Sequence, residues 1–408
     1  MKKTLIAMLT LALLLSTLVG AIAEEEVTLT FWQWDDAQVP AMQSMIDAYT
    51  ATHPNVKIEI SCVPDNPTYG TKLRTVLGTA DAPNIFWMDL VLAKEYLPTG
   101  IIQDLTPYIE ETGLDLSDLN ANVQKIYTYN DHIYAIPKDV DGVAIYYNKA
   151  LFDAAGLPYP DSSWDIDQFC ETARALTKDG IVGYTNSTSD RIWTDFLLSN
   201  GGELYNEDGT VATVNSDASA EMFQKLLDLM NEGAAYNGMQ LAETSANSAF
   251  TSGVAAMTFT GSWMISQFSA ALGDNLGICE IPSGKAGKVN AGQGLGFATT
   301  TSNPYMEETL DFLAFLSTAE AQKLQAQVVI PASNACASAW EDQYPELDLS
   351  PFTKSTEYFM AWPRPYKNYN ETGRVFAEYV SYMLYGEYET AKEMLDDANE
   401  AMNVSINE

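Results

Sequence analysis

The sequence carries little positive charge. Of its 408 residues, 21 are Lys or Arg and 55 are Asp or Glu, so the formal net charge at pH 7 is -34. Binding to nucleic acid or to anionic lipid depends on basic side chains. Both are therefore excluded as partners. The acidic residues are spread along the chain without forming a long tail, so they mainly indicate solubility, and they also permit a cationic ligand.

Histidine and cysteine are scarce. The chain has only 2 His, at positions 53 and 132, whereas a zinc site needs clustered ligands at short spacings. We therefore predict no metal centre and no cofactor. The cysteines are scattered along the chain: Cys62, Cys170, Cys279 and Cys336. They allow three full disulfide pairings, among which the sequence does not choose. For Cys62, in a strand pattern, and Cys170, on the apolar face of a helix, the pattern favours buried free thiols.

The N-terminal apolar run, residues 5–19, is shorter than the ~20 residues that a membrane-spanning helix needs. Two lysines precede it, and small residues ending at Ala23 follow it. This order predicts a secretory signal peptide over residues 1–23, although an uncleaved anchor stays open. No cysteine lies at the cleavage site, so a lipid anchor is not supported. The mature protein is expected in the periplasm or outside the cell, without membrane insertion.

The rest of the chain begins with a strand, a helix and a second strand. Residues 27–33 alternate in polarity, residues 39–49 carry apolar side chains at helical spacing, and residues 56–62 alternate again. This order predicts a parallel crossover unit in an α/β lobe. Ligands of open α/β sheets bind at the carboxyl ends of the strands, here residues 33–36 and 88–89. About 385 mature residues exceed one ordinary domain and suggest two.

The segment 133–148, IYAIPKDVDGVAIYYN, contains a break at Pro137. Proline cannot donate to a sheet ladder, so one continuous central strand is not expected here. We interpret the segment as a crossing between two lobes, with Asp139 and Asp141 at the break.

Ser163 is the predicted N-cap of the next helix, which carries Cys170 on its apolar face.

The residues after the crossing closely resemble a known family. YYNKALFDAAGL, SWDIDQF and ALTKDG resemble the central signature of the extracellular solute-binding proteins of ABC importers, in the carbohydrate-binding group that includes maltose-binding protein. FWQWDD, ADAPNIFWMDL, the Gly-Ser-Trp at 261–263, FLSTAEAQ and the Arg-Pro at 364–365 also match, in the family's order. Asn84 stands where most members carry Asp, a departure that we assign to strand entry. The resemblance covers nearly all of the mature chain.

The resemblance implies an α/β fold of the periplasmic-binding-protein-like type II, with two α/β lobes joined by a multi-strand hinge. The expected N-terminal lobe comprises residues 24–138 plus 292–335, and the C-terminal lobe 139–291 plus 336–408. The implied function is the substrate-binding protein of an ABC transporter. The protein would act as a monomer. It would capture a sugar, for which the aromatic content of the chain favours an oligosaccharide, and deliver this sugar to the membrane permease subunits.

The glycines of residues 292–303, GQGLGFATTTSN, suggest a nucleotide loop at first sight. A dinucleotide fingerprint follows a strand and opens a helix, whereas this run continues into a β-rich stretch. We therefore interpret it as a second crossing between the lobes, as the resemblance also implies.

The candidate binding residues are tryptophans and polar residues near the expected strand ends and crossings. Sugars present hydroxyl groups at their edges and C–H patches on their ring faces, so their sites need planar apolar surfaces and carboxylate or amide acceptors. As stacking platforms we predict Trp34, Trp193 and Trp263, for each of which a place in the core stays open. As hydroxyl-binding residues we predict Asp35, Asp89, Asp139, Asp141, Arg364 and Gln293. A solvated turn remains the alternative for Asp139 and Asp141.

The residues of the crossing also suggest an enzymatic function. Paired carboxylates are also typical of glycoside hydrolases, where they stand ~5 to 9.5 Å apart. No serine elbow, P-loop or His-Cys arrangement accompanies them here, and in the family the crossing segment contributes to binding, so we predict no enzyme. Two alternatives stay open: a binding protein of the same fold for a cationic or peptide ligand, and a sensor subunit that presents its ligand to a receptor.

Overall fold

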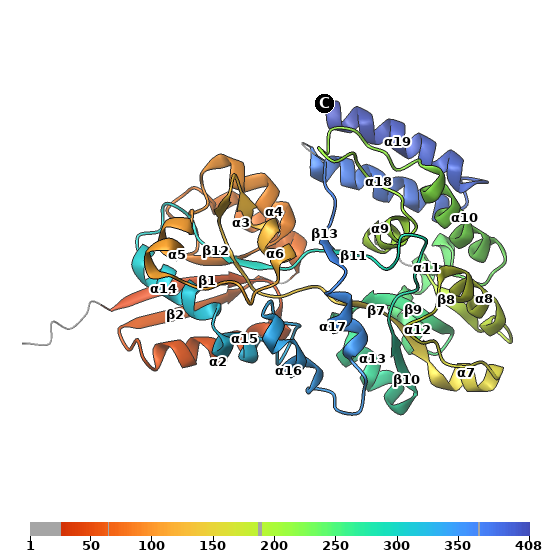
Figure 1. Cartoon of the computed structure of the whole chain (residues 1–408), viewed down its shortest axis with the longest axis horizontal. Helices are drawn as coiled ribbons and strands as arrows, with labels where there is room; N and C mark the ends of the chain where they lie inside the picture. The colour runs from red at the N-terminus through yellow and green to blue at the C-terminus, as the bar shows by residue number, and fades with distance from the viewer. Residues whose placement is uncertain (1–25, 64, 187–189, 366–367) are drawn as a thin grey trace, which may run out of the picture.

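The computed structural model describes residues 26–63, 65–186, 190–365 and 368–408. The predicted signal peptide lies outside this range. The described chain forms two α/β lobes that lie side by side (Figure 1). In these residues, no helix combines the length and the apolar character needed to cross a membrane. The predicted fold class, two α/β lobes with several strand crossings, is confirmed.

The N-terminal lobe is built on a five-stranded sheet in the order β2-β1-β3-β12-β6. Its strands are β1 (Val27–Gln33), β2 (Val56–Cys62), β3 (Ile85–Met88), β6 (Ile136–Pro137) and β12 (Gly296–Ala298). Its helices are α2 (Val39–Thr50), α3 (Asn66–Val76), α4 (Leu90–Tyr96), α5 (Thr106–Thr112), α6 (Ala121–Ile126), α14 (Met306–Leu316) and α15 (Ala319–Gln325). A small hairpin, β4 (Thr128–Tyr129) and β5 (His132–Ile133), adjoins them. Strands β1 and β2 are parallel, which confirms the predicted crossover unit.

The C-terminal lobe is built on a four-stranded sheet in the order β10-β7-β9-β8. Its strands are β7 (Val143–Asn148), β8 (Val182–Thr185), β9 (Ala255–Gly261) and β10 (Leu276–Cys279). The helices of this half are α7 (Lys149–Ala155), α8 (Ile166–Leu176), α9 (Asp190–Ser199), α10 (Asp217–Asn231), α11 (Gly238–Glu243), α12 (Ala246–Thr251), α13 (Ile265–Leu272), α16 (Ala337–Glu341), α17 (Ser350–Ser355), α18 (Tyr369–Leu384) and α19 (Ala391–Asn407). All six residues of β7 are buried, because alternate side chains enter separate cores on its two faces.

Helix α8 shows how local sequence sets an element boundary. Its N-cap is Asp165, whose side chain accepts a hydrogen bond from the backbone N–H of Gln168, while the Gln168 side chain accepts one from the backbone N–H of Asp165. The prediction of Ser163 as the cap is therefore wrong, because this reciprocal pair starts the helix two residues later. Cys170 is buried on the apolar face as predicted, and all four cysteines are free, with Cys62 half-buried.

The hinge consists of neighbouring crossings that exchange backbone hydrogen bonds. The chain leaves the first sheet at β6, whose last residue is Pro137, and enters the second at β7, so the segment is not one continuous strand, as predicted. In the crossing between them, the N–H of Lys138 donates to the carbonyl of Leu295 at 2.7 Å, and that of Val140 to Ile330 at 3.1 Å. Beside these crossings, β11 (Asn290–Gly292) pairs in parallel with β13 (Phe359–Ala361). The glycine-rich run thus forms a crossing, as predicted.

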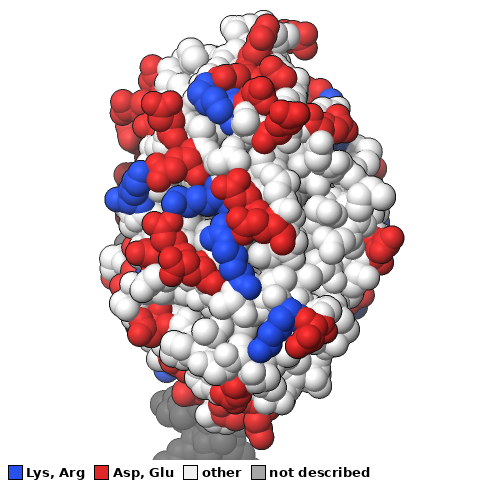
Figure 2. Space-filling model, turned by 90° about the vertical axis from the view of Figure 1, so that its right-hand side faces the viewer, with Lys and Arg blue, Asp and Glu red and all other residues white. Residues whose placement is uncertain are grey.

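Basic side chains on the C-terminal lobe lie among acidic ones. Figure 2 shows this for the face at the right of Figure 1, where lysine and arginine side chains sit beside aspartate and glutamate. Two of the pairs in this lobe join neighbouring helices: Arg174 with Glu232 at 2.5 Å, and Lys225 with Asp167 at 2.5 Å. Such exposed pairs contribute little to stability, about 0–1 kcal/mol each.

Candidate functional site

A cavity of about 620 Å³ lies between the two lobes. Its lining from the N-terminal lobe comprises Trp34, Asp35, Gln38, Asp65 and Asn66. The lining from the C-terminal lobe comprises Arg191, Ser262 and Trp263. The crossings add Asp139, Val140, Asp141, Gln293, Leu295 and Val329, and Trp362 follows β13. Residues that follow the carboxyl ends of β1 and β9 line this cavity. Ligands of α/β sheets are expected to bind at this end of the strands.

Trp34 and Asp35 directly follow strand β1. The Trp34 ring packs edge-on against the buried Trp87 ring, with 5.0 Å between centroids, and it also lies 5.0 Å from the Tyr69 ring. These buried neighbours fix the orientation of the Trp34 indole. The Asp35 carboxylate accepts hydrogen bonds from the backbone N–H of Ala37 and from the Gln38 side chain, both at 2.9 Å. Asp35 is thus held rigidly at the edge of the cavity.

Asp65 and Asn66 lie at the start of helix α3, shortly after the end of β2. Asp65 is the N-cap of α3 and has a φ of 58° and a ψ of 144°, a backbone conformation that residues with a side chain rarely adopt. Its carboxylate accepts a hydrogen bond from the Thr68 N–H at 2.8 Å. Because the carboxyl end of β2 lies beside that of β1, this segment brings a second carboxylate and an amide to the same wall of the cavity.

The floor of the cavity contains a buried ion pair. The ammonium group of Lys138 lies 2.5 Å from the Asp139 carboxylate and donates to the Gln38 side chain at 2.7 Å. It also lies 4.3 Å from the centroid of the Trp87 ring. The other oxygen of Asp139 accepts a hydrogen bond from the Leu295 N–H at 2.7 Å. Both carboxylate oxygens of Asp139 are therefore engaged by the protein.

The C-terminal wall is organised by Arg191. Its Nη1 donates to Oδ2 of Asp141 at 2.7 Å, and its guanidinium carbon lies 5.5 Å from the centroid of the Trp263 ring. The pKa of Asp141 is raised above the usual 3.8, chiefly because burial disfavours its charge; Arg191 opposes this effect and Asp139 adds to it. Trp263 itself is 54% exposed. Its indole is therefore available as a surface for a ligand.

Six of the predicted residues line the cavity: Trp34, Asp35, Asp139, Asp141, Trp263 and Gln293. The Gln293 backbone N–H donates to Asp141 at 3.2 Å, and its side-chain oxygen has no hydrogen-bond partner among the described residues. The structure thus brings together residues from both lobes and two crossings that are far apart in the sequence.

Asp89, Trp193 and Arg364 do not line the cavity. Asp89 is buried as the N-cap of α4, where its carboxylate accepts a hydrogen bond from the Leu92 N–H at 2.8 Å. Trp193 is 1% exposed and its ring packs on Phe223 in the core of the C-terminal lobe, so it offers no face to the cavity. Arg364 contacts a lining residue instead, with its guanidinium carbon 4.2 Å from the centroid of the Trp362 ring.

Six residues that line the cavity were not predicted as binding residues from the sequence: Gln38, Asp65, Asn66, Arg191, Ser262 and Trp362. The strand-end rule could have found Asp65 and Asn66, because they follow β2 as Asp35 follows β1. Trp362 lies in the loop WPRPYKNYN, whose aromatic content was a signal. Nothing in the local pattern around Arg191 indicates its position, since Asp141, with which it forms an ion pair, lies 50 residues away.

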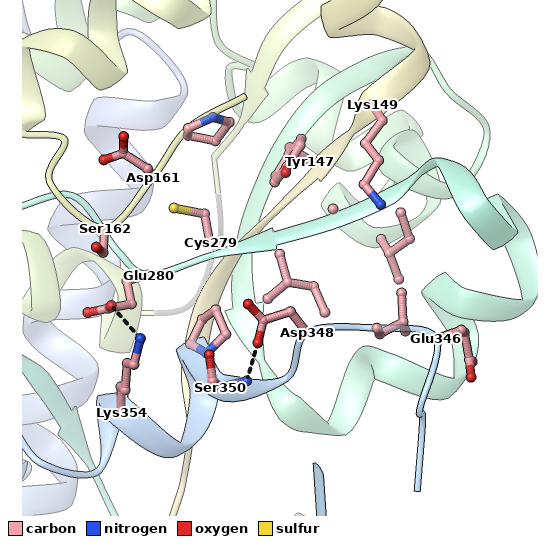
Figure 3. A pocket seen from close by; sticks show the side chains of 16 residues that line it. Tyr147, Lys149, Asp161, Ser162, Cys279, Glu280, Glu346, Asp348, Ser350 and Lys354 are labelled. Carbon is pink, nitrogen blue, oxygen red and sulfur yellow. Dashed lines mark hydrogen bonds and ion pairs between the residues drawn. The ribbon is translucent and has the colours of Figure 1, made fainter. Parts of the chain in front are cut away.

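A second hollow, of about 340 Å³, lies at the free edge of strand β10 (Figure 3). Tyr147, Cys279 and Glu280 lie in it, with Lys149 and Lys354 at its sides. Glu280 pairs with Lys288 at 2.7 Å and with Lys354 at 3.7 Å, so its charge is compensated within the protein. None of the predicted binding residues lines this hollow. Over the described part of the chain, no group of three or more His, Cys, Asp or Glu side chains is arranged to hold a metal ion.

Comparisons with known proteins agree with this architecture. A multiple sugar-binding protein of Streptococcus mutans is 22% identical over 323 residues, covering 74% of this chain and 73% of the relative. An arabinooligosaccharide-binding protein of Halalkalibacterium halodurans is 23% identical over 318 residues, covering 75% of this chain and 70% of the relative. An ABC substrate-binding protein of Listeria monocytogenes in complex with cycloalternan superposes with a TM-score of 0.82 at 23% identity, covering 94% of this chain and 100% of that chain.

A sequence model for bacterial extracellular solute-binding proteins matches residues 35–323, which is well over half of the chain. The matched range includes the four-stranded sheet, the five-stranded sheet except β1, and the first two crossings. It also includes all the lining residues of the cavity except Trp34, Val329 and Trp362. The chain therefore belongs to the family of bacterial extracellular solute-binding proteins.

Proposed function

We propose that this protein is the substrate-binding protein of an ABC importer and that it captures an oligosaccharide in the cavity between its lobes. The observation that carries the proposal is the lining itself: three indoles, Trp34, Trp263 and Trp362, surround carboxylates and amides in one cavity. Indole faces match the C–H patches of sugar rings, and carboxylate or amide oxygens accept hydrogen bonds from hydroxyl groups.

The dimensions of the cavity support a ligand of several sugar units. Its volume of about 620 Å³ lies within the range of about 300–1,000 Å³ that is typical of small-molecule sites. The named ligands of the relatives point the same way: arabinooligosaccharides for one, and cycloalternan for another. The tryptophans stand on different walls of the cavity, so one ligand would stack on more than one of them.

The proposed mechanism is closure of the hinge around the sugar. A ligand that contacts both lobes binds the closed form more tightly than the open form, so it shifts the population toward closure by that difference in affinity. Trp34 and Asp65 would supply contacts from one lobe, and Trp263 and Ser262 from the other. The permease subunits of the importer would then recognise the closed protein, which we expect to act as a monomer.

The lobe boundaries that we propose are residues 24–138 plus 292–335 and residues 139–291 plus 336–408. The hydrophobic cores support this division. One core draws almost entirely on residues 27–140 and 295–332, and another on residues 143–281 and 376–406. We further propose that residues 1–23 direct export and are removed, which agrees with an extracellular binding-protein family.

We propose that the protein does not transform its ligand. Asp139 is bound to Lys138 and to the Leu295 N–H, and Asp141 to Arg191 and the Gln293 N–H. A pair of carboxylates engaged in this way suits positioning more than proton transfer to a glycosidic oxygen. Incubation with labelled oligosaccharides is expected to return them unchanged, and any turnover would overturn this part of the proposal.

Thermal-shift measurements on the mature protein test the proposed ligand class. The panel would contain maltotetraose, isomaltotetraose, cellotetraose, xylotetraose and arabinotetraose, with spermidine and a tetrapeptide as arms for the cationic and peptide alternatives. A ligand that binds only the folded form raises the melting temperature by mass action. We expect a rise with at least one oligosaccharide. A rise with spermidine or the peptide alone would contradict the proposal.

A further inference from the structure

Arg191 connects the exposed indole of Trp263 to the hinge. While its guanidinium carbon lies 5.5 Å from the centroid of the Trp263 ring, Nη1 donates to Asp141 at 2.7 Å and Nη2 donates to Asn290 at 2.9 Å. Asp141 belongs to the crossing between β6 and β7, and Asn290 begins β11 at the second crossing. One side chain therefore contacts two crossings and a wall of the cavity.

The contacts of Arg191 form a closed arrangement. Asn290 donates from its side-chain amide to the backbone carbonyl of Asp141 at 2.7 Å, so Arg191, Asp141 and Asn290 each contact the other two. Arg191 is only 8% exposed, so water has little access to these bonds. The guanidinium group is planar, and two hydrogen bonds from different nitrogens fix the plane against which an aromatic ring can lie.

The Trp263 ring is also constrained from its own strand. A Cβ atom on Gly261 would lie 2.0 Å from an atom of the Trp263 ring, so the ring lies directly against the backbone at that position. Gly261 has a φ of -93° and a ψ of 174°, which any residue can adopt. The glycine is therefore required by the ring and not by the backbone conformation.

We propose that Arg191 and Gly261 are positioning residues that hold the Trp263 indole in the orientation that receives the ligand, and that Arg191 couples this orientation to the hinge. The identity of the ligand in this inference rests on the proposed function, but the orientation of the indole is measurable without any ligand. When the crossings bend, Asp141 and Asn290 move the guanidinium group, and the indole follows.

A ligand-free experiment tests the role of Arg191. Tryptophans labelled as 5-fluorotryptophan give separate ¹⁹F NMR signals, and Trp263→Phe assigns the signal of Trp263. In Arg191→Lys, an ammonium can still pair with Asp141, but it lacks the planar fork and the stacking surface. We expect the Trp263 signal to shift in Arg191→Lys and to shift further in Arg191→Met. An unchanged signal in both variants would overturn the inference.

A pH profile separates positioning from simple loss of structure. Asp141 faces Arg191 and Asp195 on α9, Asp139 on its own crossing, and Tyr127 at the end of α6. In Arg191→Met, the Gln293 N–H still opposes the effect of burial on Asp141, but the larger opposing effect, that of Arg191, is lost. The pKa of Asp141 therefore rises further, and the acid-side midpoint of the Trp263 signal moves to higher pH. In Arg191→Lys the wild-type midpoint is expected to return. A midpoint equally displaced in both variants would contradict the assigned role.

The test of Gly261 has a matched control in the same sheet. A Cβ on Gly277 of β10 would lie 2.1 Å from the ring of Tyr147, which lies in the separate hollow of Figure 3. Both substitutions, Gly261→Ala and Gly277→Ala, therefore displace an aromatic ring from a strand glycine. We expect Gly261→Ala to weaken binding of the tightest oligosaccharide of the panel by about tenfold. Gly277→Ala should lower the melting temperature and leave affinity unchanged, because Tyr147 is buried.

The outcomes distinguish this inference from the proposed function. If an oligosaccharide binds the wild type, and Arg191→Lys and Gly261→Ala bind it equally tightly with an unchanged Trp263 signal, the inference fails while the proposed function stands. If no oligosaccharide of the panel binds the wild type, the proposed function fails, and the ¹⁹F signal of Trp263 alone decides the inference.

Discussion

The buried ammonium group of Lys138 lies 2.5 Å from the carboxylate of its neighbour Asp139. Lys138 is fully buried, so both members of the pair are removed from water, and each leaves an uncompensated charge if the other is lost. The pair also fixes the Gln38 side chain, which binds Asp35 at the edge of the cavity. The floor of the site is thus charged but internally neutralised.

Replacing Lys138 by Met is expected to destabilise the protein strongly. Asp139 would remain buried without its counter-ion, and breaking such a pair costs about 3–5 kcal/mol of unfolding free energy. In Lys138→Met/Asp139→Asn the charge is removed from both partners, and the amide oxygen can still accept the Leu295 hydrogen bond, so stability should largely return. Urea unfolding of the ligand-free proteins measures both effects. A double variant less stable than the single one would contradict the pairing.

The exposed Trp263 is expected to matter for binding and not for folding. Because it is 54% exposed, Trp263→Ala opens no core cavity, and the unfolding free energy should change by no more than about 0.5 kcal/mol. The affinity for the best oligosaccharide should fall by about 2 kcal/mol or more, as for a central aromatic contact. Fluorescence titration and thermal unfolding check the two parts. A large loss of stability at unchanged affinity would place the residue in the core.

Trp193 is expected to behave in the opposite way. It is 1% exposed and packed against Phe223, so Trp193→Ala removes a large core side chain and should cost about 3–5 kcal/mol of unfolding free energy. Trp193→Phe, a milder truncation, should fold and bind the same oligosaccharide with unchanged affinity. If Trp193→Phe were fully stable but lost binding, the indole would have to reach the ligand, against its position in the structure.

Asp195 should make stability depend on pH. It is 1% exposed, and one of its oxygens accepts a hydrogen bond from the Ala291 N–H at 2.6 Å. Burial raises its pKa from the usual 3.8 to about 8, although Arg191 opposes the rise. At pH values between 3.8 and about 8, the Asp195 carboxyl group is ionised in the unfolded chain but protonated in the folded protein. The contribution of this group to stability therefore falls as pH rises through that window.

Asp195→Asn isolates this effect, because the amide oxygen can keep the Ala291 hydrogen bond and does not titrate. The stability of the variant relative to wild type should grow from about pH 4 to about pH 8, by at most about 1.4 kcal/mol per pH unit, and then level off. Urea midpoints at several pH values give the difference. A constant difference across this range would show that Asp195 is not protonated in the folded protein.

The local sequence pattern was sufficient to predict those elements whose structure depends mainly on their own residues. The alternation in residues 27–33 and 56–62 predicted the parallel pair β1 and β2, and the strand-end rule then led to Trp34 and Asp35 at the cavity. Pro137 marked the crossing because proline has no N–H to donate to a sheet ladder, and it is the last residue of the edge strand β6.

The remaining site residues depend on contacts between distant parts of the chain. The same strand-end rule selected Asp89, but its carboxylate is used by its own helix as an N-cap, which competes with ligand binding. Trp193 lies on the side of α9 that faces Phe223 in α10. This contact between two helices cannot be predicted from the sequence around Trp193 alone. Arg191 reaches Asn290, 99 residues away, so its role emerges only in three dimensions.

Isothermal titration calorimetry of the mature wild-type protein, with Trp263→Ala in parallel, tests the central claim most directly. The titrant is the oligosaccharide of the panel that stabilises the protein most. The account predicts one binding site per chain in the wild type and a heat signal largely lost in Trp263→Ala. No heat with any oligosaccharide, or the same affinity in both proteins, would contradict capture of a sugar between the lobes.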